Sequence, residues 1–408
     1  MIYVFTYLSD QLLNLFIGFG AVGLTTTIVL TWLRNVALPD GIHRFELIRN
    51  YYAFAFLASL SLWSVSAAFL SSCGLQYKGF LSLILLWLVF FSWRILSILS
   101  IVLNYRISNL ILIIGGLSIV AQYMGIGILS TFWDFNKPAG FFTEPSHASM
   151  YLLPLIVFRL LRNCKDLISL ICIGVIALFS SSASFIVGLV LLALVIFSRI
   201  FILSPRRLFT SLFGFGLILV GVSFNYLGLL DFSLISDRVN AILLAASRDD
   251  PTGIMNASAI VWLNGWSQAY ETFAITNGLG VGWNQMGCGD FYDVGRFSNH
   301  IRLWTGTIIL NWNDGSFMAS KLIVELGIFG ILIVLWLCYI SIRSIYQYAS
   351  SSDLDELYEA QVCANAAGAI GALSLLFVRA NGYYLMPVIL LLALLFFRAY
   401  PSSSAIKK

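Results

Sequence analysis

Long apolar runs recur along the whole chain, and short polar stretches separate them. Most runs approach the ~20 residues that a helix needs to cross a hydrocarbon core of roughly 30 Å. The pattern therefore predicts an all-α, polytopic integral membrane protein with about eleven transmembrane helices. The expected helices cover residues 11–33, 51–70, 79–103, 108–129, 145–161, 167–179, 185–201, 208–226, 316–340, 362–377 and 383–397.

One polar segment, residues 227–315, interrupts this pattern. The segment divides the chain into a helix bundle (1–226), a large loop (227–315) and a group of C-terminal helices (316–408). Long ordered connections are commonly functional, so we expect the loop to contribute to the site. Within the loop, "AIVWLNGWSQAYETF" places Trp262, Trp266, Ala269 and Phe273 at steps of three and four residues. This spacing predicts an amphipathic helix that lies on the outer membrane surface.

Composition and charge support a membrane protein and give it an orientation. Of 408 residues, 60% are hydrophobic and 10% are charged, whereas soluble domains are about one quarter charged. The net charge of +4 is small and does not indicate nucleic-acid binding. If the N-terminus faces outward, most Arg and Lys residues fall in inner loops and in the C-terminal tail, as the positive-inside rule requires. Residues 227–315 then face the outside.

The six cysteines lack CxxC spacing, so they do not predict a zinc site. In this topology only Cys73 and Cys288 share the outer face. A disulfide between them is one interpretation, and ordinary membrane cysteines are the preferred one.

The first group of candidate site residues lies in "GFFTEPSHAS". Pro145 suits the first position of a helix, which Thr143 or Glu144 would cap. Glu144, His147 and Tyr151 share one face of that helix, and its N-terminal end would stabilise an anion on the outer side. The residues therefore indicate either a capped helix or one wall of a diphosphate site.

The second group lies in the large loop. Arg238 and Arg248 suit bidentate binding of phosphate oxygens, or they pair with the neighbouring aspartates. "GRFSNHIRLW" brings Arg296, His300 and Arg302 together, and the imidazole of His300 is either a general base or a loop side chain without a chemical role.

The third group follows the loop, in "NDGSFMASKLIVELGIFG". Asp314 falls at the expected membrane edge. Lys321 and Glu325 are one helical turn apart, and their opposite charges favour a structural pair within the membrane. Arg94, in the expected helix 79–103, also needs a partner, for which Glu325 and Glu144 are candidates.

Taken together, these segments resemble the O-antigen and exopolysaccharide polymerase family (Wzy type), which is related to the O-antigen ligases. The resemblance rests on the order of "GFFTEPSHAS", "LFSSSASFIVGLVLLAL", "TNGLGVGWNQMG" and "GSFMASKLIVELGIFG", and it covers roughly residues 107–340. The chain departs from many relatives in "NASAIVWLNGW", which has no arginine before the loop helix. Arg296 and Arg302 are therefore candidates for that role.

The resemblance implies a GT-C-like glycosyltransferase of the bacterial inner membrane, with its active site facing the periplasm and with no cofactor or metal. Its substrates would be undecaprenyl-diphosphate-linked oligosaccharides, and its other partners membrane lipids, a chain-length regulator and a flippase. It implies diphosphate or glycan binding by Arg238, Arg248, Arg296, Arg302 and Asp314, and catalysis by Glu144, His147 or His300. A ligase that transfers glycan to lipid A core, and a lipid-linked oligosaccharide transporter, are the alternatives.

Overall fold

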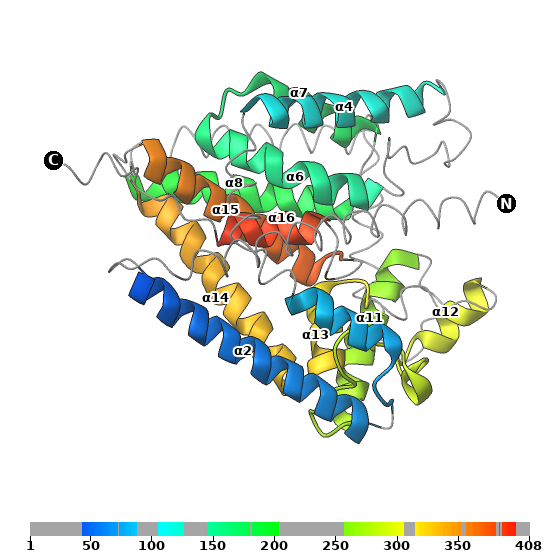
Figure 1. The fold of residues 1–408 in the computed structure, drawn as a ribbon. Helices are drawn as coiled ribbons and strands as arrows, with labels where there is room; N and C mark the ends of the chain where they lie inside the picture. The colour runs from blue at the N-terminus through cyan, green and yellow to red at the C-terminus, as the bar shows by residue number, and fades with distance from the viewer. Residues whose placement is uncertain are drawn as a thin grey trace. The chain divides into compact units, whose positions relative to one another are not determined.

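A computed structural model gives the fold, which is entirely helical in the residues that it describes (Figure 1). These residues are 43–71, 73–87, 105–125, 140, 145–179, 182–203, 257–305, 315–351, 356–380, 383 and 386–396. The helices are α2 (His43–Leu70), α4 (Tyr105–Tyr123), α6 (Pro145–Arg162), α7 (Leu167–Phe179), α8 (Ala183–Leu203), α11 (Ala257–Ile275), η3 (Gly289–Phe291), α12 (Ser298–Thr305), α13 (Met318–Leu326), α14 (Ile328–Ser350), α15 (Glu356–Phe377) and α16 (Met386–Leu395).

The chain forms two compact units, each assembled from separate stretches of sequence. Unit 1 comprises Met1–Leu96, Ile260–Leu335 and Ala380–Leu385, and unit 2 comprises Ser97–Ala259, Trp336–Arg379 and Met386–Lys408.

Unit 2 is a helix bundle around α6, which packs against α4, α7, α8, α15 and α16. Its core contains Leu152 and Ile156 of α6, Ile176 of α7 and Phe185 of α8, each at most 1% exposed. The side of α15 that meets α16 is built from small residues. A side chain at Gly368 would meet the backbone of Leu395, so glycine there permits the close approach that membrane helices commonly use.

In unit 1, helix α2 packs against α13, and the turns that follow α11 pack beside α13. Stacked aromatic side chains join α2 to the start of α14, where the rings of Trp63 and Phe329 lie 5.9 Å apart. The loop segment 276–297, between α11 and α12, consists mainly of turns and includes η3. Most of the candidate site described below belongs to this unit.

Several helix predictions agree with the structure. Helix α6 begins at Pro145, and α7 occupies the predicted residues 167–179. The predicted helix 316–340 is wrong as a single element, because the chain turns at Gly327 between α13 and α14. Gly327 has a φ of 58°, in the left-handed region that glycine adopts most readily.

Two of the described helices, Ile328–Ser350 and Tyr358–Phe377, are long and apolar enough to cross a membrane. Five shorter apolar helices accompany them within the described residues. Within the described residues the regular structure is therefore all helical and includes two candidate spans, and the count of eleven stays a prediction. The predicted helices 11–33 and 208–226 lie outside the described residues.

Candidate functional site

A buried ion pair lies at the centre of unit 1. Lys321 Nζ is 3.2 Å from Glu325 Oε1, one turn along α13, and the two residues are 2% and 0% exposed. The Glu325 carboxylate also accepts hydrogen bonds from the backbone N–H groups of Asn284 (2.6 Å) and Met286 (3.3 Å) and from Tyr383 Oη (2.8 Å). A buried carboxylate needs such compensation for lost hydration. The pair thus has the structural role that its spacing favoured, and it joins three distant segments.

Tyr383 extends this cluster toward α2. Its ring stacks on Trp283, with centroids 4.0 Å apart and planes 15° from parallel, and Lys321 Nζ lies 5.2 Å from the Tyr383 centroid. The backbone N–H of Trp283 donates to Ser64 Oγ of α2 at 2.7 Å. Stacking and cation–π contact thus place the tyrosine hydroxyl on the buried carboxylate.

The glycine-rich loop, residues 276–287, packs closely against the C-terminal end of α13. The N–H groups of Val281 and Gly282 donate to the carbonyls of Val324 and Glu325 at 3.0 and 2.8 Å, and Ile328 N–H donates to Gly278 O at 2.8 Å. A Cβ on Gly280, whose φ is +81°, would lie 2.5 Å from Glu325 O. The glycines in "TNGLGVGWNQMG" therefore permit backbone-to-backbone packing.

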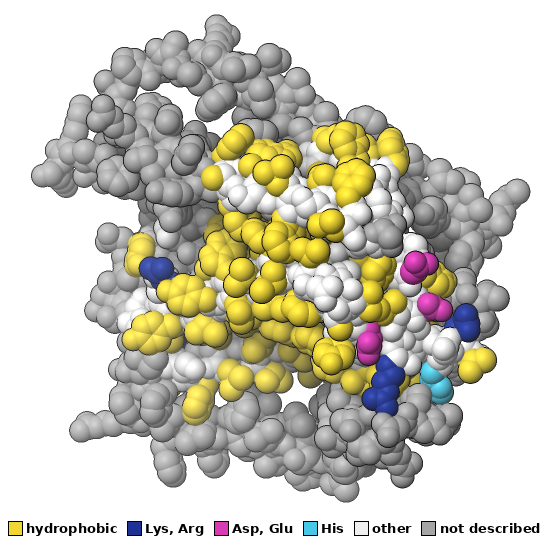
Figure 2. Space-filling view, turned by 90° about the horizontal axis from the view of Figure 1, so that it is seen from below, with side chains coloured by type: hydrophobic (Ala, Val, Ile, Leu, Met, Phe, Trp, Pro, Cys, Tyr) yellow, Lys and Arg dark blue, Asp and Glu magenta, His cyan; other side chains and the backbone are white. Residues whose placement is uncertain are grey.

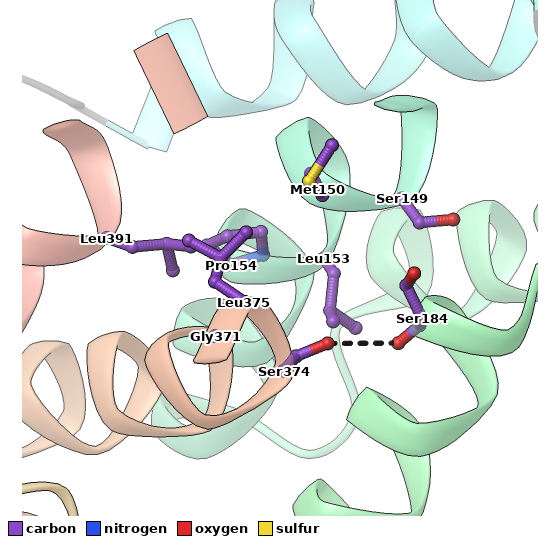
Figure 3. Close-up of a pocket in the computed structure, with 9 residues that line it drawn as sticks. All are labelled: Ser149, Met150, Leu153, Pro154, Ser184, Gly371, Ser374, Leu375 and Leu391. Atoms are coloured by element: carbon purple, nitrogen blue, oxygen red, sulfur yellow. Dashed lines mark hydrogen bonds between the residues drawn. The ribbon is translucent and has the colours of Figure 1, made fainter. Parts of the chain in front are cut away.

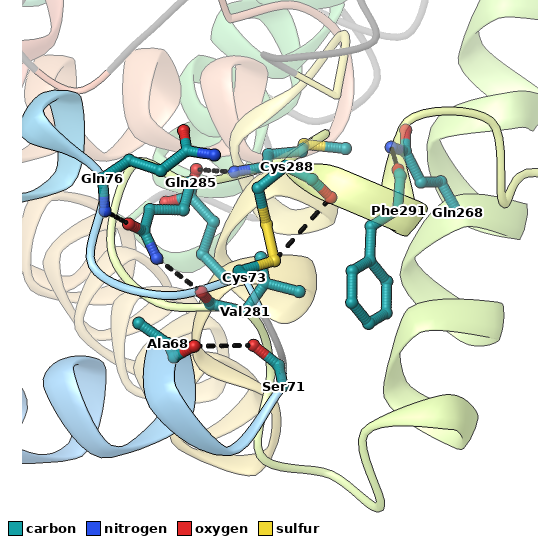
Figure 4. Close-up of a disulfide and its surroundings, with 11 residues drawn as sticks. Ala68, Ser71, Cys73, Gln76, Gln268, Val281, Gln285, Cys288 and Phe291 are labelled. Atoms are coloured by element: carbon teal, nitrogen blue, oxygen red, sulfur yellow. Dashed lines mark hydrogen bonds between the residues drawn. A yellow bond between two sulfur atoms is a disulfide. The ribbon is translucent and has the colours of Figure 1, made fainter.

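A disulfide fastens the other end of this loop to the segment after α2 (Figure 4). Cys73 and Cys288 are bonded, with Cα atoms 5.7 Å apart and 215 residues of sequence separation. The preference for ordinary membrane cysteines at these positions is therefore wrong. Gln285 lies beside the disulfide, where its Oε1 accepts from Gln76 N–H at 2.7 Å and its Nε2 donates to Val281 O at 2.8 Å.

Helix α11 is present as predicted, but its polar face packs inside unit 1. Asn264, Gln268 and Thr272 recur every four residues and are each at most 3% exposed. Asn264 Oδ1 accepts from the backbone N–H of Phe297 at 3.1 Å and from Ser298 Oγ at 3.3 Å, which fixes the start of α12. Ala269 of the predicted apolar face is 2% exposed and packs in a hydrophobic cluster of unit 1 with Val281 and Met286.

Three predicted site residues occur together at α12. Arg296 and Arg302 are exposed, and His300 is half-buried. The backbone N–H of Arg296 donates to Ser267 Oγ at 2.7 Å, and the Arg302 guanidinium donates to Asn299 Oδ1 at 2.9 Å. Figure 2 shows a face dominated by hydrophobic side chains, on which most of the acidic, basic and histidine side chains gather in one area.

The remaining predicted site residues have no described side chain. Glu144, Arg238, Arg248 and Asp314 lie outside the described residues, as does Arg94. His147 lies in the first turn of α6, and its side chain also falls outside the description. The structure therefore describes Arg296, His300 and Arg302 on one short stretch at the start of α12, and the proximity of the candidate site residues to one another stays a prediction.

In unit 2, sequence reasoning missed one charged cluster. Arg159, near the end of α6, was not among the predicted site residues, and it is 2% exposed. Its Nε and Nη2 donate to the two Asp166 oxygens at 2.9 and 2.5 Å, and its Nη1 donates to Ser108 Oγ at 3.0 Å and to Asn109 Oδ1. Asp166 also accepts from Ser169 N–H at 2.9 Å and so caps α7. The signal was available, since an aspartate seven residues after an arginine can pair with it across a helix–helix turn.

A small pocket in unit 2 is lined by α6, α8, α15 and α16 (Figure 3). Ser374 Oγ donates to the Ser184 carbonyl at 3.4 Å, and most of the remaining lining is apolar, including Leu153 and Leu391. Near it, Ser149 and Ser182 share a hydrogen bond of 2.6 Å. These serines satisfy one another within the bundle, so the pocket is a packing feature.

Comparison of the chain with protein-family models, with curated proteins and with solved structures gives no match.

Proposed function

We propose that the chain is an O-antigen or related surface-polysaccharide polymerase of the bacterial inner membrane. It would be an inverting, metal-independent glycosyltransferase that joins undecaprenyl-diphosphate-linked repeat units on the periplasmic face. The observation that carries the proposal is the disulfide-bonded segment, which is followed within a few residues by Arg296, His300 and Arg302, with both arginines exposed.

The disulfide supports the outward orientation of this segment. Protein disulfides form and persist in oxidising compartments such as the periplasm, and they are rare in the cytosol. Charge counting independently assigns the same side to Cys73 and Cys288. Repeat units carried on a lipid diphosphate would meet the exposed arginines on that side of the membrane.

The proposed reaction is a single displacement. A sugar hydroxyl of the acceptor unit forms a bond to the anomeric carbon of the donor glycan, and the bond from that carbon to the diphosphate oxygen breaks. The hydroxyl proton passes to a base, for which His300, His147 and Glu144 are the candidates. The electron pair leaves with the lipid diphosphate.

Charge that develops on the departing diphosphate needs preorganised donors. A guanidinium stays charged and binds two phosphate oxygens at once, which suits a reaction without a metal ion. Arg296 and Arg302 are exposed, and the Arg302 guanidinium donates to Asn299 Oδ1, an amide oxygen. Arg238, Arg248 and Asp314 are the further substrate-binding candidates.

Deletion of the gene provides the first test. In cells without it, the surface glycan should stop at one repeat unit on core, whereas the parent produces a ladder. An unchanged ladder would refute the proposal. Core that carries no repeat unit at all would instead favour the ligase, because loss of a ligase prevents the attachment of glycan of every length.

Arginine variants test the site itself. Arg296→Ala and Arg302→Ala should each lower the polymerisation rate about 10²-fold, by analogy with the loss of one preorganised donor. Arg343→Ala, at an exposed position on α14, is the control and should keep the parental ladder. Membrane protein levels should be equal in all three, as judged by immunoblot. Parental ladders from both variants would remove these arginines from the site.

A further inference from the structure

Helix α11 presents an aromatic stripe, defined here as Trp262, Trp266 and Tyr270. The residues are four apart, so they follow one another along the helix at intervals of about 6 Å. Trp262 and Trp266 are half-buried, and Tyr270 is 70% exposed. A stripe that served only as core would be buried at each position.

Packing beneath the stripe holds its two tryptophans in place. Phe317, which is 0% exposed, has ring centroids 5.7 Å from Trp262 and 4.8 Å from Trp266. The two indoles meet each other edge to face at 6.1 Å. Gly265 lies against the Gly315 carbonyl and the Phe317 ring, so no larger residue fits under this part of α11. The rings are therefore preorganised.

The surroundings of the stripe argue against insertion into a bilayer. Helices that lie on membranes place their apolar face in lipid and a Lys- and Arg-rich face in water. Helix α11 contains neither Lys nor Arg, and Glu271 is its one charged residue. Its polar face is buried in unit 1 through Asn264 and Gln268. The exposed acids Asp290 and Asp293 in the same unit would also repel an anionic membrane surface.

Hydrogen-bonding groups flank the stripe instead. Ser267 follows Trp266 and accepts from the backbone N–H of Arg296, whose own side chain is exposed. Glu271 follows Tyr270. Aromatic faces that stack on the C–H face of a pyranose, together with polar side chains that bind its hydroxyls, form a site suited to a sugar chain. The 6 Å interval is comparable to the length of one sugar residue.

We infer that the aromatic stripe, with Ser267, Glu271 and Arg296 beside it, is a binding site for an oligosaccharide. The site would hold the glycan part of the substrate, away from the diphosphate. This inference deepens the proposed function and rests on it for the identity of the ligand. Its chemistry requires no lipid and no charge on the sugar.

The test separates the sugar from its carrier. Lipid-linked repeat units are extracted from cells that lack the gene, and mild acid releases the free oligosaccharide. This oligosaccharide is titrated by calorimetry into the full-length protein in detergent. Trp266→Ala and Tyr270→Ala should each weaken binding about tenfold, as expected for the loss of one stacking contact. Trp266→Phe should recover most of the affinity.

Ile275→Ala is the matched control, because Ile275 is also on α11 and is 57% exposed but is not aromatic. It should bind like the parent. Equal affinity in the parent, Trp266→Ala and Tyr270→Ala would overturn the inference, as would no binding of the oligosaccharide to the parent. Tryptophan fluorescence gives a second test, in which parent and Trp266→Phe are compared with spin-labelled lipid and with oligosaccharide. If spin-labelled lipid quenches the Trp266 emission and oligosaccharide leaves it unchanged, the stripe contacts the bilayer and the inference is overturned.

The two proposals can fail separately. If the oligosaccharide binds to the stripe but deletion of the gene leaves the ladder intact, polymerisation is wrong and the glycan site stands. If deletion abolishes the ladder but Trp266→Ala and Tyr270→Ala both bind oligosaccharide like the parent, polymerisation stands and the stripe has no part in glycan binding.

Discussion

The buried Lys321–Glu325 pair gives the sharpest test of how unit 1 is held together. Lys321→Met removes one of the four donors to Glu325, whose carboxylate keeps two N–H groups and the Tyr383 hydroxyl. Breaking a buried pair costs about 3–5 kcal/mol, and the three remaining hydrogen bonds place this variant near the lower end.

Glu325→Gln should cost more. It removes the Glu325 charge from the buried Lys321 ammonium, and it points the new side-chain NH₂ group toward groups that are themselves donors. A buried unsatisfied donor adds about 1–3 kcal/mol to the loss of the pair. The double variant Lys321→Met/Glu325→Gln also removes the buried ammonium, so we expect it to be no less stable than Glu325→Gln alone. A coupling energy of about 2 kcal/mol between the two positions follows.

Thermal midpoints of the full-length protein in detergent would measure the order of stability among these variants. All midpoints should be recorded at one scan rate, because unfolding of such proteins is commonly irreversible. Glu271→Gln, on half-buried α11 surface, is the control and should change stability by less than about 0.5 kcal/mol. Single variants that match this control would show that the pair adds no stability. Strict addition of the two single effects in the double variant would refute the coupling argument.

Three further variants test other contacts. Cys288→Ser should lower the free energy of unfolding by about 2–4 kcal/mol, because the disulfide closes a loop of 215 residues. In intact cells, a maleimide that cannot cross membranes should label Cys73 in this variant and not in the parent. Gly280→Ala should destabilise more than Gly74→Ala as judged by thermal midpoint, since both glycines have positive φ but only Gly280 lies against backbone; equal shifts would contradict the close approach. Asp166→Asn should cost about 3 kcal/mol by the same measurement, because it removes the carboxylate charge that pairs with the buried Arg159 guanidinium. A shift no larger than that of the exposed Asp290→Asn would contradict this.

The sequence predicts those features of the fold that depend on local pattern. Residues 167–179 form a uniform apolar run that directly follows Asp166, so both ends of α7 could be predicted. Pro145 likewise indicated the start of α6. Lys321 and Glu325 could be paired because their contact spans one helical turn.

Features that depend on distant segments could not be predicted. The break at Gly327 lies within an apolar run, and its partner is Gly278, which is about fifty residues earlier. Charge counting placed Cys73 and Cys288 on one side of the membrane but gave no distance between them. The burial of Arg159 depends on contacts with Ser108 and Asn109 of another helix, which its own sequence neighbourhood does not indicate.

The loop between α11 and α12 is fastened by contacts of three different kinds: a covalent bond at Cys288, hydrogen bonds to the carboxylate of Glu325, and backbone contacts to the end of α13. Asn264 then connects that loop to the start of α12. Most of the residues that make these contacts are buried. The exposed side chains of this segment include the charged residues Asp290, Asp293, Arg296 and Arg302. Rigid presentation of rings and guanidinium groups is what binding of a flexible sugar chain requires, because the protein then contributes little further ordering cost on binding. In the proposed glycan site, the buried polar residues of unit 1 would support the binding surface, and the search for substrate contacts should begin with the exposed residues of α11 and α12.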